Sequence, residues 1–105
     1  MDLERKKKEV FKLLDILEQI AMKEGRLHWE VQDKREKFTE GRIMTFEDEN
    51  GFNPNLVRDC FQNARILARR ALKMPETKKC TPSDIVWFVL DYLWAESAKR
   101  NNNES

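Results

Sequence analysis

The residues able to carry catalysis or bind a metal are few and scattered. His28 is the single histidine of the 105-residue chain, and no nucleophile motif lies near it. Glu24 and His28 have the helical spacing of two metal ligands, but two ligands do not complete a zinc site. Cys60 and Cys80 form no CxxC motif, a pattern typical of two reduced thiols inside a cell. We therefore expect no catalytic residue, no metal, no cofactor and no small-molecule substrate.

A stripe of basic residues suggests a different chemistry, contact with phosphates. Arg58, Arg65, Arg69 and Lys73 recur at helical spacing and share one flank of a predicted helix. Arginine binds phosphate groups well, so the stripe predicts nucleic-acid contact as an alternative function. The structural alternative is a solvated flank or ion pairs with acidic neighbours. The whole chain carries 20 Lys and Arg against 19 Asp and Glu, a net charge of +1, and so has no global attraction to polyanions.

Apolar residues crowd the segment from Ile85 to Trp94. Trp87, Leu90 and Trp94 share one side at helical spacing, and the other apolar residues lie toward the opposite side. A short chain has too few helices to wrap such a segment, so one side is expected to contact another chain. Tryptophan is enriched at interface hot spots, which makes Trp87, Leu90 and Trp94 the predicted protein interface. The alternative is that both tryptophans fill the core of their own chain.

The first helix that must position these residues is predicted at about 3–24. Its apolar residues recur at spacings of three, four and seven. Gly25 is a natural stop signal. Val31 and Phe38, however, continue the seven-residue repeat of Val10 and Leu17, so the helix is expected either to end at Gly25, to run past it, or to restart as a second helix over about 27–39.

The second half of the chain has stronger start signals. The spacing in Thr45–Asp48 matches a capping box and predicts a short helical turn up to Asn50. Asn53 followed by Pro54 predicts the N-terminus of a helix that ends near Lys73. The box formed by residues 81–84 predicts the last helix, which the sequence pattern continues to about residue 98.

These elements predict an all-α fold, a small bundle of three to five helices that oligomerisation would complete. Residues 1–100 form one domain and 101–105 a disordered tail. No apolar run reaches the roughly 18 residues of a membrane span, and no signal peptide is evident, so we expect a cytoplasmic protein. Its expected function is that of a non-enzymatic protein–protein interaction module: a regulator, an adaptor or a small subunit of an assembly. The expected partner is a protein, and first of all a second copy of the chain.

Overall fold

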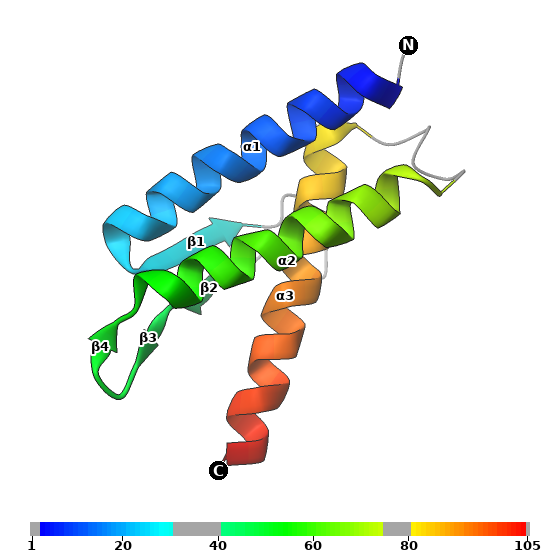
Figure 1. Cartoon of the computed structure of the whole chain (residues 1–105). Coiled ribbons are helices and arrows are strands. Elements are labelled where there is room, and N and C mark those ends of the chain that lie inside the picture. Colours follow the sequence, from blue (N-terminus) through cyan, green and yellow to red (C-terminus); the bar gives the residue numbers. More distant parts are fainter. Residues whose placement is uncertain (1–2, 31–40, 75–80, 105) are drawn as a thin grey trace.

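Residues 3–30, 41–74 and 81–104 are described by the structure, a computed structural model. This part of the chain is mostly helical, with three α-helices and two antiparallel sheets of two strands each (Figure 1). The elements follow in the order α1 (Leu3–Glu24), β1 (Arg26–Glu30), β2 (Gly41–Thr45), β3 (Glu47–Asp48), β4 (Gly51–Phe52), α2 (Pro54–Leu72) and α3 (Pro82–Glu104). The predicted helical class is confirmed, whereas the two small sheets were not expected.

Helix α1 has the predicted bounds and ends at Gly25. Its buried side consists of Val10, Leu14 and Ala21, which recur at spacings of four and seven. Gly25 has a φ of 73°, and its N–H donates to the carbonyl of Ala21 at 2.8 Å. This left-handed conformation ends the helix. Glycine adopts it readily, whereas a residue with a side chain would be strained there.

Strand β1 follows Gly25 directly, so neither a continued first helix nor a helix beginning at Leu27 is correct. The remainder of the helix expected over 27–39 lies outside the described residues. β1 pairs antiparallel with β2, and Leu27 lies opposite Met44 on the buried side of the hairpin. His28 and Ile43 form the next pair, on the exposed side. The side-chain period of two therefore turns one side of this sheet toward the helices.

The helical turn predicted at 45–50 is wrong, because β3 and β4 form a tight hairpin there. Its turn is held by the Asp48 side chain, which accepts hydrogen bonds from the backbone N–H of Asn50 at 2.8 Å and from Asn53 Nδ2 at 3.0 Å. Gly51 takes a φ of 102°. Phe46, which precedes the hairpin, is buried at 1 % exposure. Phe46 stands between β2 and β3, and its burial in the core favours the extended backbone observed there.

Helices α2 and α3 begin at the predicted caps. The Asn53 side chain accepts from the backbone N–H of Asn55 at 3.0 Å, and Pro54 occupies the first turn of α2. Before α3, Asp84 N–H donates to Thr81 Oγ1 at 3.2 Å while Thr81 N–H donates to Asp84 Oδ2 at 3.3 Å. This reciprocal pair is the predicted capping box. α3 continues to Glu104, so it includes most of the segment assigned to a tail.

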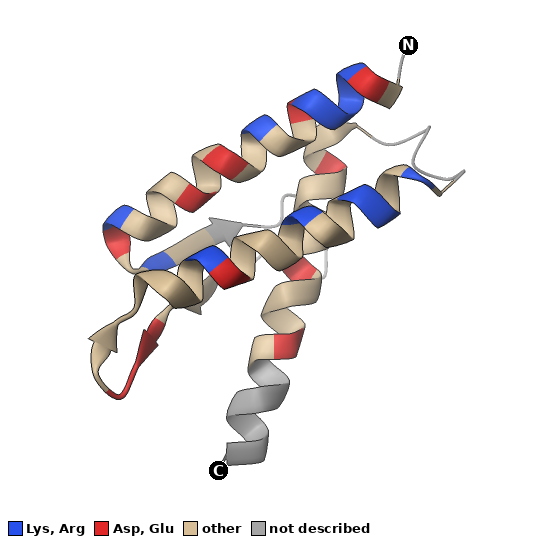
Figure 2. Ribbon diagram, viewed as in Figure 1, with Lys and Arg blue, Asp and Glu red and all other residues tan. Residues whose placement is uncertain are grey.

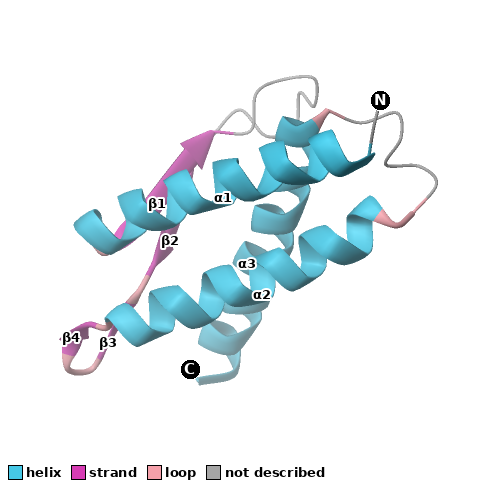
Figure 3. Cartoon of the chain, turned by 45° about the horizontal axis from the view of Figure 1, so that its top comes forward, coloured by secondary structure: helices cyan, strands magenta, loops and turns pink. Residues whose placement is uncertain are grey.

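All three helices contact one another around a single core, and β1 contacts α1 (Figure 3). α3 crosses behind α1 and α2, and its C-terminal end extends beyond them (Figure 1). The fully buried large side chains come from every helix and from the β1–β2 region: Val10, Leu14, Leu27, Phe46, Val57, Phe61, Val89 and Leu90. None of the described helices is long and apolar enough to span a membrane.

Candidate protein-interaction surface

The buried side of α3 is continuous with the core. Ile85, Val86, Val89 and Leu90 are all exposed by 3 % or less. Leu90, one of the predicted interface residues, is fully buried by its own chain. It therefore contributes to the stability of the fold and is not on the surface where a partner could reach it.

Trp87 and Trp94 lie beside this buried side and are half-buried, packed against the core. Trp94 Nε1 donates to the backbone carbonyl of Ile43 at 3.0 Å, which ties α3 to β2. A tryptophan N–H usually finds such a partner when its ring is removed from water. Both tryptophans therefore contribute to intramolecular packing and leave only part of each ring at the surface.

The aromatic side chains that α3 leaves outside are Phe88 and Tyr92. Phe88 is 54 % exposed and Tyr92 is 48 % exposed. They are four positions apart in the sequence, so they lie one turn apart on the same side of the helix. Asp84 and Asp91 occupy the adjacent helical positions, at spacings of four and three from Phe88, respectively. We call these four residues the α3 edge.

Sequence reasoning recognised that α3 is apolar on more than one side, but it did not single out Phe88 and Tyr92, which are more exposed than the two tryptophans. The rule that tryptophan marks an interface favoured Trp87 and Trp94. In the structure Trp94 is hydrogen-bonded to β2 and Trp87 packs against the core, whereas Phe88 and Tyr92 stay more exposed. The sequence prediction did not include a β1–β2 hairpin, and so gave no reason to expect this hydrogen bond.

Arg65 of the basic stripe binds α1. Its guanidinium forms hydrogen-bonded ion pairs with Asp15 and Glu18, and only 26 % of the Arg65 side chain is exposed. Burial disfavours the charge, but the two carboxylates outweigh this effect and raise the pKa of Arg65 above its ordinary value. Arg65 therefore connects α2 to α1, as the structural alternative expected.

The other three members of the stripe are divided between intramolecular contact and solvent. The Arg69 guanidinium lies over the Phe11 ring, 5.2 Å from its centroid. Arg58 Nη1 donates to Asn55 Oδ1 at 3.4 Å, and Lys73 is the exposed C-cap of α2. Helical spacing alone therefore does not make the four residues one uniform phosphate-binding flank.

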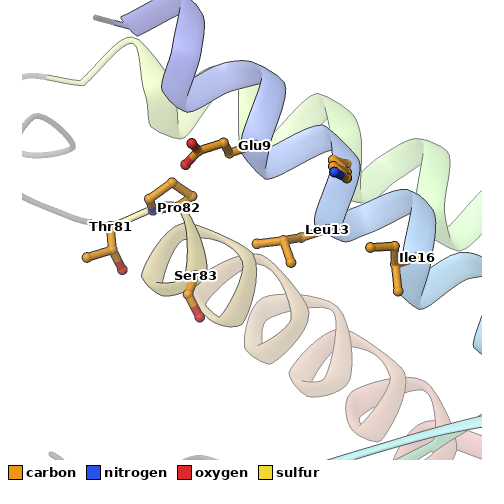
Figure 4. Close-up of a pocket in the computed structure, with 7 residues that line it drawn as sticks. Glu9, Leu13, Ile16, Thr81, Pro82 and Ser83 are labelled. Carbon is orange, nitrogen blue, oxygen red and sulfur yellow. The ribbon is translucent and has the colours of Figure 1, made fainter. Parts of the chain in front are cut away.

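A groove of about 420 Å³ lies between α1 and the start of α3 (Figure 4). Leu13, Ile16 and Pro82 give it an apolar lining. Its polar lining residues are Glu9, Lys12, Thr81 and Ser83, with neither histidine nor cysteine. The groove therefore combines an apolar surface with four polar side chains.

The remaining chemistry-bearing residues lie apart from this groove. His28 is exposed on β1, opposite Ile43. Cys60 Sγ contacts Met44 Sδ at 3.6 Å and is half-buried. Cys80 lies outside the described residues. Within the ranges that the structure covers, no three His, Cys, Asp or Glu residues are grouped so that they could hold a metal.

Comparison with protein-family models, curated proteins and solved structures finds no match to this chain.

Proposed function

We propose that the chain is a non-enzymatic protein-interaction module that binds its partner through the α3 edge. The observation that carries the proposal is the exposure of Phe88 and Tyr92, 54 % and 48 %, on neighbouring turns of one helix. Large aromatic side chains contribute strongly to binding when a partner buries them. They are anchored on a helix whose other side is part of the core, so the chain is already ordered before it binds.

The proposal retains α3 as the binding helix but places the centre of the contact at Phe88 and Tyr92 instead of Trp87 and Trp94. Trp87 and Trp94 border the α3 edge on the side of β2, and their exposed parts would form the rim of the contact. Nucleic-acid binding through the basic stripe is the weaker proposal, because Arg65 and Arg69 already have partners on α1.

The test compares the wild-type chain with the variant Phe88→Ser/Tyr92→Ser in its native host. Each tagged protein is used to retrieve interacting proteins, and each retained protein is then purified and titrated against both by calorimetry. We expect a complex, with the chain itself or with another protein, that the variant weakens by about 10-fold or more. The matched control is Ile20→Ser, which changes a 41 % exposed apolar residue on α1.

The proposal is wrong if the wild-type chain forms no complex with any protein, including itself. It is also wrong if the Phe88→Ser/Tyr92→Ser variant binds the partner as tightly as the wild type does.

A further inference from the structure

The charge pattern of the α3 edge defines the partner that would fit it. From Asp84 to Ser97 the charged residues are Asp84, Asp91 and Glu96, and none is basic. Figure 2 shows acidic positions and no basic one on the part of α3 that is not drawn in grey. Opposite charges across an interface orient the partners, whereas like charges are unfavourable. A partner surface for the α3 edge must therefore combine basic residues with an apolar side chain.

The solvent side of α2 has that combination. Ile66 is 39 % exposed and projects among polar residues. Arg70 follows it by four positions and Lys73 by seven, so both lie on the same side of the helix as Ile66. Both basic residues are exposed. We call Ile66, Arg70 and Lys73 the α2 face; Arg69 borders it, but its guanidinium lies over the Phe11 ring of α1.

Charge separates the two surfaces clearly. The C-terminal half of α2 is basic, whereas residues 84–97 of α3 carry only acidic charges (Figure 2). The two surfaces also differ in their apolar parts, because the α3 edge presents two aromatic rings and the α2 face one branched aliphatic side chain. Each surface is like-charged with itself and opposite in charge to the other.

We infer that the α3 edge of one chain docks on the α2 face of a second copy. Phe88 and Tyr92 would pack around Ile66, while Asp84 and Asp91 approach the bases of the α2 face. This inference rests on the proposed function and names the partner. Because the two surfaces differ, the contact is heterologous, and each docked pair leaves one α3 edge and one α2 face unoccupied. Copies would therefore add head to tail into a ring or a chain of subunits.

The test uses sedimentation velocity of the full chain across a range of concentrations. The edge variant is Phe88→Ser/Tyr92→Ser, and the face variant is Ile66→Ser/Arg70→Glu. We expect the wild type to form species larger than a dimer as its concentration rises, and less so at high salt. Each variant alone should be monomeric. An equal mixture of the two should form a 1:1 heterodimer and nothing larger, since only one intact pair of surfaces remains.

The control variant Ile20→Ser should associate like the wild type. Circular dichroism checks that each variant keeps its helical content. If a double variant does not fold, the single substitutions Phe88→Ser in the α3 edge and Ile66→Ser in the α2 face take its place. A wild type that stays monomeric up to about 1 mM overturns the inference, as does a mixture that stays monomeric. A face variant that still dimerises does so too, because it would show an α3 edge paired with itself.

The two proposals fail separately. A monomeric wild type that binds another protein through Phe88 and Tyr92 keeps the proposed function and overturns the self-docking inference. A chain that binds neither itself nor another protein overturns both.

Discussion

Helices α2 and α3 differ in how much of their apolar surface is buried within the chain itself. α2 places its buried residues on one side, and its flank is engaged with α1 through Arg65 and Arg69. α3 places apolar residues on its buried side and also at Phe88 and Tyr92, outside the core. An amphipathic helix such as α2 therefore buries most of its apolar residues within its own fold, with Ile66 as the exposed exception. A helix with apolar residues on additional sides has surface left for another molecule.

The largest effects should come from the buried sides, where the two helices are alike. Phe61→Ala on α2 should lower the free energy of unfolding by about 3–5 kcal/mol, and Leu90→Ala on α3 by about 2–5 kcal/mol. Both side chains are fully buried, so truncation loses packing and leaves a cavity. Urea denaturation measures the loss. A change under about 1 kcal/mol for Leu90→Ala would contradict its assignment to the core.

The Arg65 ion pairs should give intermediate effects. Glu18→Gln should cost about 1–2 kcal/mol, because the Glu18 side chain is only 15 % exposed and its removal leaves Arg65 with a weaker partner. Asp15→Asn should cost about 0–1 kcal/mol, since the Asp15 side chain is 64 % exposed. Thermal denaturation at low and high salt would compare the two. Equal losses would mean that burial does not distinguish these carboxylates.

The helix caps should contribute similarly to both helices. Asn53→Ala removes the acceptor at the start of α2, and Thr81→Ala removes the one at the start of α3. Each should destabilise the chain by about 1 kcal/mol. Chemical denaturation followed by circular dichroism provides the measurement. Asn53→Ser is the matched control, because serine is also a good cap and should recover most of the stability.

Substitutions in the α3 edge should hardly change the stability of the monomer. Phe88→Ser should change the free energy of unfolding of the monomer by less than about 0.5 kcal/mol, in contrast to Leu90→Ala two positions away. The measurement must be made at a concentration where the chain is monomeric. A loss comparable to that of Leu90→Ala would place Phe88 in the core and remove the basis of the proposed interface.

The smallest expected effect is the loss of stability in acid that comes from Asp48, in the turn before α2. The backbone N–H of Asn50 and the side chain of Asn53 lower the pKa of Asp48 below its ordinary value. A lowered pKa in the folded state gives stability above the unfolded-state pKa, and that stability is lost as pH falls through the folded value. Asp48→Asn should therefore flatten the loss of stability in the acid range. An unchanged slope in a pH series of denaturation curves would argue against this contribution.

The helices were predictable because their signals are local. The caps at Asn53 and Thr81 lie next to the helices they start, and the repeat of α1 lies within it. The hairpin was not, since β1 is only five residues long and β2 lies about ten residues beyond its end. The partners of Arg65 lie 47 and 50 residues away in the sequence, so the local sequence pattern around Arg65 could not predict them. The candidate surface on α3 depends on what covers each side, so it required the fold.

Gly25 determines the alignment of the hairpin with the helices. Its carbonyl accepts from the N–H of Phe46 at 3.1 Å, and the Phe52 ring approaches to 3.1 Å from where a Cβ would lie. Leu27 is buried two residues later, and His28 next to it is exposed. One inserted residue after Gly25 would exchange these two roles and turn the apolar side of β1 outward. Sequences with this fold should therefore tolerate changes of length elsewhere before they tolerate one between Gly25 and Leu27.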